Sequence, residues 1–456
     1  MKLRARFAVL GEGFDRKLLA PMISGAILNP VNSSIISVSL VPIGAAFGAP
    51  PTATAWLVSA LYLATAVGQP VAGKLIDVHG PRRLFLGASV LVGLAGLLGM
   101  LAPGLGVLIV ARVLLGFGTC AGYPAAMRMI RDEAERTGKD SPAGVLTVLA
   151  MATQTIAVIG PPLGGLLIGI GGWRATLGVN IPFAILAFVL GARRIPATAR
   201  KTTNRPNLDF PGMALFAGML VSLLLFLMHP SARDWYLPLI TVVAAIAFVL
   251  RELRATEPFI DVRMLAGNRP LVTTYLRALL AYIVSYAFLY GYTQWLEDGR
   301  GLTAAQAGLI QLPVFATALV VSGLTGRRKE VRAKLAVGAL CQILACALML
   351  VLWSESGIWL LVGIALIFGI TQGLMSLALQ NSVYHQANPD SIGTSAGLLR
   401  TFSYLGAIVA SAAQGGFYGQ RADTGGLHQL ATFLLVMGGL LLLITLADRK
   451  LGRTIH

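Results

Sequence analysis

The chain has 456 residues, of which 56% are hydrophobic and 12% are charged, and its mean hydropathy is +0.76. Because soluble globular proteins carry roughly 25% charged residues, this composition excludes that class and indicates an integral membrane protein. The net charge of +17 would fit a nucleic-acid-binding protein only if the basic residues gathered on one surface.

Charge-free runs mark the candidate membrane spans, because a helix needs roughly 20 apolar residues to cross the hydrocarbon core of a bilayer. Residues 18–73 contain no charged side chain, and this run is long enough for two helices divided at the turn residues 48–51. The pattern predicts an all-α membrane protein with fourteen membrane helices. They cover residues 19–46, 54–76, 84–102, 105–128, 143–171, 175–193, 211–229, 235–251, 271–296, 303–326, 334–353, 357–380, 392–417 and 427–447.

The basic residues of the loops predict the orientation, because short loops rich in Lys and Arg stay on the cytoplasmic side. One alternating set of loops and termini holds 29 of the 36 basic residues, and the opposite set holds 4. Both termini are therefore expected in the cytoplasm, and most of the net charge reflects topology. The three remaining bases lie inside predicted spans: Arg112, Arg277 and Arg400.

The stretch GKLIDVHGPRR at 73–83 forms the predicted cytoplasmic turn between the second and third helices. Asp77 is unusual there, because an acid contributes little to topology and is better placed against a helix N-terminus or an arginine. We expect it to cap the thirteenth predicted helix near Ser391 when the cytoplasmic side is closed. The predicted gate residues are Gly73, Asp77, Gly80, Arg82 and Arg83.

Several predicted helices carry one polar face, which indicates a cavity because lipid tolerates polar side chains poorly. In the fourth helix Arg112, Thr119 and Tyr123 share such a face, although isolated polar residues can also only bridge helices. Arg277 and Arg400 lie close enough to a helix end for their side chains to reach the cytoplasmic surface instead. The predicted cavity residues are Asn29, Asn32, Arg112, Thr119, Tyr123, Arg277, Tyr286, Tyr290, Gln372, Ser376 and Arg400.

The ninth predicted helix carries a stripe formed by Tyr282, Tyr286, Tyr290 and Gln294. Such a stripe offers stacking surfaces and hydroxyl groups to an amphipathic molecule, and packing in the core is the alternative. Arg277 lies roughly 180° around the helix from Tyr286, so both cannot face one ligand in a regular helix.

The fifth predicted helix contains closely spaced glycines on both sides of a proline pair, which permit close helix contact and bending. Simple packing would explain the glycines without any role in transport. The predicted packing motif consists of Gly160, Pro161, Gly164 and Gly165.

The turn matches the pattern G-x-L-x-D-x-x-G-x-R and resembles the loop signature of the major facilitator superfamily. GLTGRR at 323–328 is a partial repeat of this signature without the aspartate. Two further stretches resemble motifs of the same superfamily: ARVLLGFG at 111–118 is similar to its fourth-helix arginine motif, and IGPPLGG at 159–165 is similar to its antiporter motif. This resemblance implies two parallel six-helix bundles with a substrate cavity between them, and alternating access through the turn at 73–83 as inner gate.

Three further stretches resemble the fourteen-helix drug:proton antiporter branch: residues 172–182, 257–265 and 393–406. That branch implies a six-helix bundle at 1–193, a linker at 194–210, two added helices at 211–251, a linker at 252–270, a second six-helix bundle at 271–447 and a tail at 448–456.

The chain departs from this branch at Asn32, where a first-helix aspartate is common, and at Leu115, where glutamine is frequent. None of the nineteen acids is expected at mid-membrane depth, and the nearest lie at the boundaries. Embedded arginines without embedded acids predict a cationic interior, which favours an anionic or zwitterionic substrate.

The primary hypothesis is a secondary transporter that exports small amphipathic organic compounds. The alternatives are an uncoupled or differently coupled transporter of an anionic metabolite, a facilitator or importer, and an intramembrane enzyme, for which the sequence offers no convergent catalytic groups. The expected partners are the lipid bilayer, a small-molecule substrate and, if transport is coupled, protons. We expect a monomer in the cell (inner) membrane, with no nucleic acid, cofactor or metal.

Overall fold

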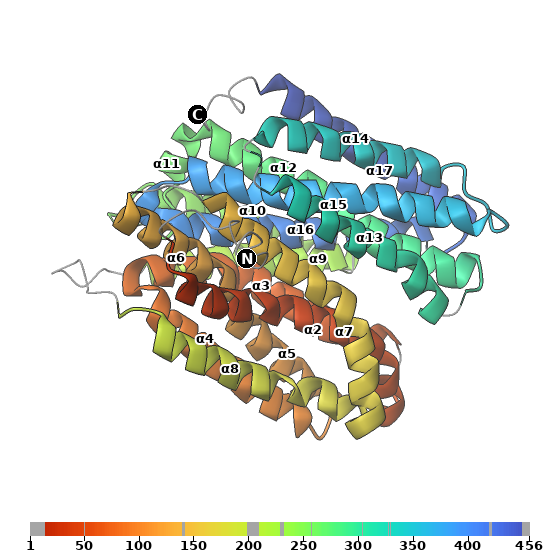
Figure 1. The fold of residues 1–456 in the computed structure, drawn as a ribbon, viewed down its shortest axis with the longest axis horizontal. Helices are drawn as coiled ribbons and strands as arrows, with labels where there is room; N and C mark the ends of the chain where they lie inside the picture. The colour runs from red at the N-terminus through yellow and green to blue at the C-terminus, as the bar shows by residue number, and fades with distance from the viewer. Residues whose placement is uncertain are drawn as a thin grey trace, which may run out of the picture. The chain divides into compact units, whose positions relative to one another are not determined.

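The computed structural model describes residues 14–49, 51–138, 142–197, 209–228, 232–256, 258–302, 304–326, 328, 330–418 and 422–448. The regular secondary structure of these residues is entirely helical (Figure 1). This agrees with the predicted fold class, because a chain in hydrocarbon must satisfy its backbone hydrogen bonds within each helix.

Contacts divide the chain into two compact units. Unit 1 comprises Met1–Ala214, Arg254–Ile260 and Ala387–Thr401. Its helices are α2 (Leu19–Phe47), α3 (Pro51–His79), α4 (Pro81–Met100), α5 (Leu105–Thr119), α6 (Gly122–Thr137), α7 (Pro142–Gly178) and α8 (Asn180–Arg194), together with the first residues of α9 (Phe210–Met228) and of α16 (Ile392–Tyr418).

Unit 2 comprises Leu215–Leu253, Asp261–Gln386 and Phe402–His456. Besides most of α9 and α16, it contains α10 (Tyr236–Glu252), α11 (Val262–Gly267), α12 (Arg269–Ala287), α13 (Ala304–Thr325), α14 (Val331–Met349), α15 (Ile358–Gln386) and α17 (Thr424–Ala447). Two π-helical segments, Phe288–Tyr292 and Trp295–Gly299, continue α12.

Within the described residues, every predicted span overlaps helical structure. Among the described residues, eleven helices are long and apolar enough to cross a membrane, or twelve when a bent pair within α7 is counted as one span. That pair, Gly144–Gly160 and Leu163–Gly178, meets at 55°. The break falls on Pro161 and Pro162, which lack the amide N–H that a continuous helix needs. The two predicted spans that are too short by this measure are α8 and α10, at 15 and 17 residues.

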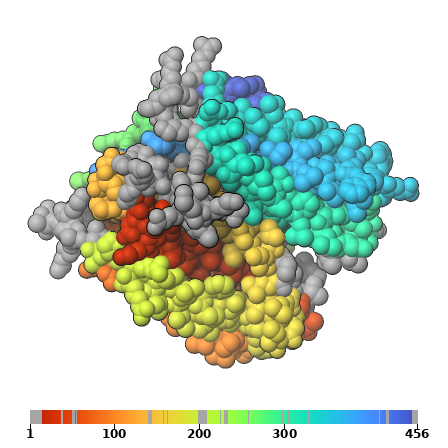
Figure 2. All heavy atoms as spheres, viewed as in Figure 1, coloured from red at the N-terminus to blue at the C-terminus, as the bar shows by residue number. Residues whose placement is uncertain are grey.

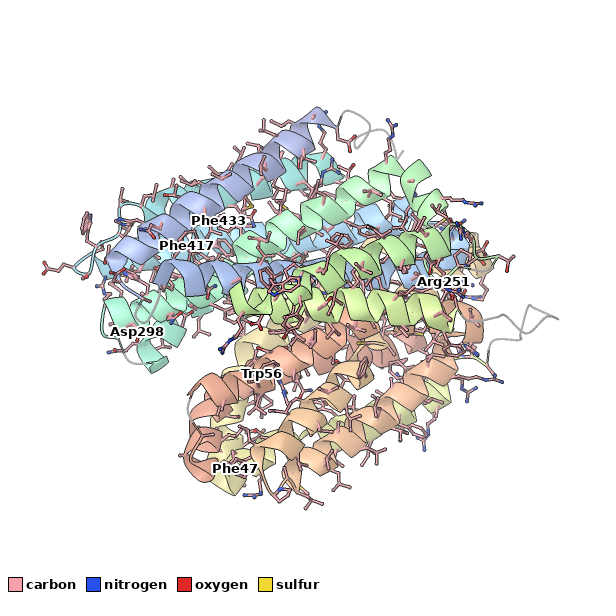
Figure 3. All side chains as sticks on the ribbon, turned by 180° about the vertical axis from the view of Figure 1, so that it is seen from behind. Phe47, Trp56, Arg251, Asp298, Phe417 and Phe433 are labelled. Atoms are coloured by element: carbon pink, nitrogen blue, oxygen red, sulfur yellow. The ribbon has the colours of Figure 1, made fainter. Side chains whose placement is uncertain are left out.

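Each unit has its own apolar interior. In unit 1 the buried side chains include Ile43, Leu57 and Leu177. In unit 2 the rings of Phe288 and Phe368 are stacked with their centroids 3.9 Å apart. Phe417 of α16 packs on Phe433 of α17 at 5.9 Å, and Figure 3 labels this pair.

Apolar side chains also cover the outside of the helices. On α8, which Figure 2 shows in yellow-green on the surface, Ile185 and Leu186 are 60% and 51% exposed. A water-soluble protein rarely presents such a continuous apolar face. It suits a helix whose outer surface contacts lipid.

Candidate functional site

The carboxylate of Asp77, in the last turn of α3, lies at the N-terminus of α16. It accepts hydrogen bonds from the backbone N–H groups of Gly393 and Thr394, at 2.9 and 2.8 Å, and from the Thr394 hydroxyl at 2.8 Å. The first N–H groups of a helix lack partners within the helix and carry partial positive charge, so an acid is favourable there. The expected cap near Ser391 is present, two residues further along the chain.

Glycines bring the two helices close enough for this contact. A Cβ atom added to Gly73 would collide with the carbonyl group of Gly393, and one added to Gly397 would collide with that of Gln69. One turn farther along α16, the Thr401 hydroxyl donates to the carbonyl of Ala66 at 2.8 Å. The backbones of α3 and α16 therefore touch over several turns within unit 1.

The remaining residues of the predicted gate shape the turn between α3 and α4. Gly80 has a φ of +83°, a conformation that residues with a Cβ rarely adopt. Arg82 donates to the carbonyl of Ala192 near the end of α8 at 2.8 Å. Arg83 is exposed. The turn thus connects α3, α4 and α8, and Asp77 is its residue that hydrogen-bonds α16.

Arg112 is 1% exposed and donates from Nε to the carbonyl of Leu57 on α3 at 2.9 Å. Its Nη2 atom is buried and has no hydrogen-bond partner among the described residues. A buried guanidinium is costly unless its donors are satisfied. This position could therefore bind a water molecule or an anionic group.

Four other predicted cavity residues form two contacting pairs in unit 1. The amide of Asn29 donates to the hydroxyl of Thr119 at 3.2 Å. The guanidinium of Arg400 lies over the ring of Tyr123, 4.3 Å from its centroid. Since Thr119 and Tyr123 are one turn apart, the structure places these residues in the same part of unit 1.

Asn32 is bound to α8. Its amide and that of Asn180 donate to each other at 2.7 and 2.9 Å. The Asn32 amide also donates to the carbonyl of Leu28 in α2, and the Asn180 amide to that of Leu177 at the end of α7. Both residues are buried. The hydrogen-bonding groups of Asn32 are thus engaged within the protein, which corrects the expectation that this side chain faces a cavity.

Arg277 corrects the prediction that the embedded arginines have no acidic partner. Its side chain is fully buried and donates to the carboxylate of Asp448 at 2.7 Å and to the carbonyl of Ile444 at 3.2 Å. Asp448 follows the end of α17, 171 residues away in the sequence. The predicted cationic interior is therefore neutralised at this position, and Arg277 caps a helix C-terminus.

The tyrosine stripe is present in unit 2. The centroids of Tyr282 and Tyr286 are 5.9 Å apart, as are those of Tyr286 and Tyr290, and the second pair is nearly parallel at 16°. Tyr290, in the π-helical segment that continues α12, is 36% exposed, and Tyr286 is partly buried, whereas Arg277 is buried. On α15, the amide of Gln380 donates to Ser376 at 2.9 Å, and Gln372 is partly buried.

The predicted packing motif is only partly involved in helix contacts. A Cβ atom added to Gly160 would overlap the hydroxyl of Ser34 on α2, so this glycine is required for the contact of α2 with α7. Gly164 is buried. Gly165 is exposed and faces open space, so its expected role in close packing is wrong.

Sequence reasoning missed three partners: Asn180, Asp448 and the segment at Pro258, whose carbonyl accepts a hydrogen bond from Lys74 at 2.8 Å. In each case the partner lies more than a hundred residues away, and neither hydropathy nor helical spacing reports such a pairing. A weak signal existed for Lys74, because it is part of the same turn sequence as Asp77.

Comparison with known proteins gives the family. A profile of the Major Facilitator Superfamily matches residues 22–411. The uncharacterized MFS-type transporter YwoD of Bacillus subtilis is 34% identical over 96% of this chain and 97% of its own length. The cephamycin export protein CmcT of Amycolatopsis lactamdurans is 29% identical over 82% of this chain and 79% of its own length.

A further relative is the puromycin resistance protein pur8 of Streptomyces alboniger, 27% identical over 86% of this chain and 80% of its own length. The solved structure of the human organic anion transporter MFSD10 (TETRAN) matches with a TM-score of 0.64, covering 93% of this chain and 97% of that one. At 16% identity this likeness shows the fold alone. The profile and the relatives together establish that the chain is a multi-pass membrane protein and belongs to the major facilitator superfamily.

Proposed function

We propose that this protein exports small amphipathic organic compounds across the cell membrane by alternating access, in the manner of the fourteen-helix drug:proton antiporter branch. The proposal counts α8 and α10 as membrane spans, which gives fourteen, with both termini in the cytoplasm. Relatives named for cephamycin export and puromycin resistance support export of organic compounds. The tyrosine stripe of α12 supports an amphipathic substrate, because its rings combine apolar faces with hydroxyl groups.

The observation that carries the proposal is the contact of Asp77 with the start of α16. In the proposed domain organisation α3 belongs to the six-helix bundle at 1–193 and α16 to the bundle at 271–447. A carboxylate of one bundle would then cap a helix of the other, and this contact would hold the cytoplasmic side closed. Opening that side requires Asp77 to release all three donors. Hydrogen bonds to a charged group are strong enough for this release to influence the rate of the cycle.

The test is transport by the Asp77→Asn variant in inverted membrane vesicles, with ethidium as the cationic probe and carboxyfluorescein as the anionic probe. An amide keeps the size of the side chain but removes the charge and an acceptor, so turnover should fall about tenfold, the equivalent of about 1.4 kcal/mol. Asp390→Asn is the matched control, because it removes an exposed acid three residues before Gly393. Equal transport by both variants and the parent would contradict the gate.

Proton coupling is a separate part of the proposal. The carboxylates of a coupled transporter must bind and release protons during the cycle. In unit 1 Asn32 occupies the position of the usual first-helix acid. Asp77 is the acid to test there, because the proposed cycle breaks and remakes its contacts. Substrate accumulation measured with and without a protonophore separates the two cases: loss of accumulation supports antiport, and unchanged accumulation contradicts it.

Arg112 favours a second candidate function, uncoupled or differently coupled transport of an anionic metabolite. Its buried Nη2 has no partner among the described residues, and a carboxylate or phosphate group would satisfy it. Under this alternative Arg112→Met would abolish transport of carboxyfluorescein and spare that of ethidium. Equal loss of both would leave Arg112 with a structural role and exclude the alternative.

A further inference from the structure

Two segments from beyond residue 214 belong to unit 1: Arg254–Ile260 and Ala387–Thr401. Both contact the last turn of α3. Asp77 accepts hydrogen bonds from the start of α16, and Lys74, three residues earlier, donates from Nζ to the carbonyl of Pro258 at 2.8 Å. A single helical turn therefore binds both segments.

The segment Pro258–Ile260, hereafter the linker plug, is well anchored. Phe259 is 1% exposed and Ile260 is 5% exposed, although both lie in a connection between helices, where side chains are usually accessible. Immediately after it, Asp261 caps α11 by accepting a hydrogen bond from the N–H of Met264 at 2.9 Å. Arg263 donates back to the carbonyl of Leu253. The linker plug is thus held by buried side chains and is followed by a fixed helical turn.

We propose that the linker plug forms a second contact that stabilises the closed inner gate, the turn at 73–83. In this contact Lys74 is a positioning residue for Asp77. The side chains at 74 and 77 project from one turn of one helix, so the position of that turn sets both hydrogen bonds together. When Lys74 is bound to Pro258, the end of α3 is fixed where the Asp77 carboxylate meets the N–H groups of Gly393 and Thr394. The gate function rests on the proposed function, but the coupling between the two contacts does not.

Amide hydrogen exchange of the whole protein in lipid nanodiscs, without substrate, tests this coupling. The Gly393 and Thr394 amides donate to Asp77 and report its contact directly. In Lys74→Met, their exchange and that of residues 259–264 should both rise at least about fivefold, the lower end of measured coupling between sites. Lys17→Met, which makes the same change at an exposed lysine, should leave both regions unchanged.

Coupling is reciprocal, so the converse variant must agree. Asp77→Asn should raise exchange not only at 393 and 394 but also across 259–264. If Lys74→Met loosens 259–264 alone, or Asp77→Asn loosens 393 and 394 alone, the linker plug is merely anchored beside the gate and the proposal is overturned. The same holds if Lys74→Met changes neither region.

A second pair of variants tests the buried aromatic side chain of the linker plug. Phe259→Ala removes the buried ring, and Phe210→Ala removes a ring that is 66% exposed at the start of α9. The proposal is supported if amide exchange at 393 and 394 increases in Phe259→Ala but not in Phe210→Ala. Equal exchange in the two variants contradicts it. Because these measurements use no substrate, they hold even if no export of ethidium or carboxyfluorescein is found.

Discussion

The beginning of α16 and the end of α17 are both held by charged side chains of other helices, but the charges are opposite. Asp77 accepts hydrogen bonds from the first N–H groups of α16. Arg277 and Arg332 donate to the carbonyls of Ile444 and Leu446 in the last turn of α17. Both arrangements follow from the helix dipole, which is positive at the N-terminus and negative at the C-terminus.

The two contacts differ in how easily they could be released. Asp77 is partly buried, and its partners are N–H and O–H groups that water could satisfy after release. Arg277 is fully buried and paired with Asp448, so release would leave a charge without a partner in the interior. In the proposed transport cycle we therefore expect the first contact to open and the second to stay intact within unit 2.

The largest expected effect comes from blocking the first contact sterically. The Cβ atom of Gly73→Val would overlap the backbone of Gly393, the two further methyl groups add to the crowding, and relief of this overlap costs about 3 kcal/mol. Ethidium export should therefore fall more than about 100-fold. Gly87→Val in α4 is the control, because its position faces open space. Export retained in Gly73→Val would show that α3 and α16 need not touch for transport.

Breaking the second contact should affect stability more than transport. Arg277→Met removes the guanidinium that pairs with Asp448, and because this carboxylate is 20% exposed the change should cost about 2 kcal/mol, measured as a lower thermal unfolding midpoint in detergent. The double variant Arg277→Met with Asp448→Leu removes both charges and should recover most of that loss. A selective loss of transport at unchanged stability would show that this pair also belongs to the transport cycle.

The helix positions and the contact at the start of α16 could be predicted from the sequence. Hydropathy located the long apolar helices but not the short α11 in the predicted linker at 252–270. The acid in the turn at 73–83 indicated a helix N-terminus near Ser391, and Asp77 binds close to it, at Gly393 and Thr394. The end of α17 could not be predicted in this way. Asp448 directly follows the last residue of α17, where an acid needs no partner, and only the packing of α12 against α17 brings it to Arg277. The pairing of Asn32 with Asn180 could not be predicted either, because helical periodicity shows which residues share a face but not which helix packs against that face.

A smaller effect is expected from removing one donor of the first contact. Thr394→Val keeps the shape of the side chain and the backbone N–H but removes the hydroxyl that donates to Asp77. The loss of one hydrogen bond of about 1 kcal/mol should reduce export about fivefold. Thr394→Ser restores the donor and should restore transport. Unchanged export by Thr394→Val would show that the hydroxyl is not needed, and failure of Thr394→Ser would show that the hydrogen bond alone does not explain the loss.

The smallest effect should follow from removing the outer of the two α17 contacts. Arg332 donates to the carbonyl of Leu446 at 2.9 Å from a partly exposed position, where water can replace it. Arg332→Met should therefore cost less than about 0.5 kcal/mol, and Arg332→Lys less still, because lysine keeps a donor. Both thermal midpoints should stay close to the parent value, well above that of Arg277→Met. If Arg332→Met lowered the thermal midpoint as much as Arg277→Met, burial would not distinguish the two contacts at the end of α17. The greater stability expected of the Arg277 contact would then have to come from its pairing with Asp448 alone.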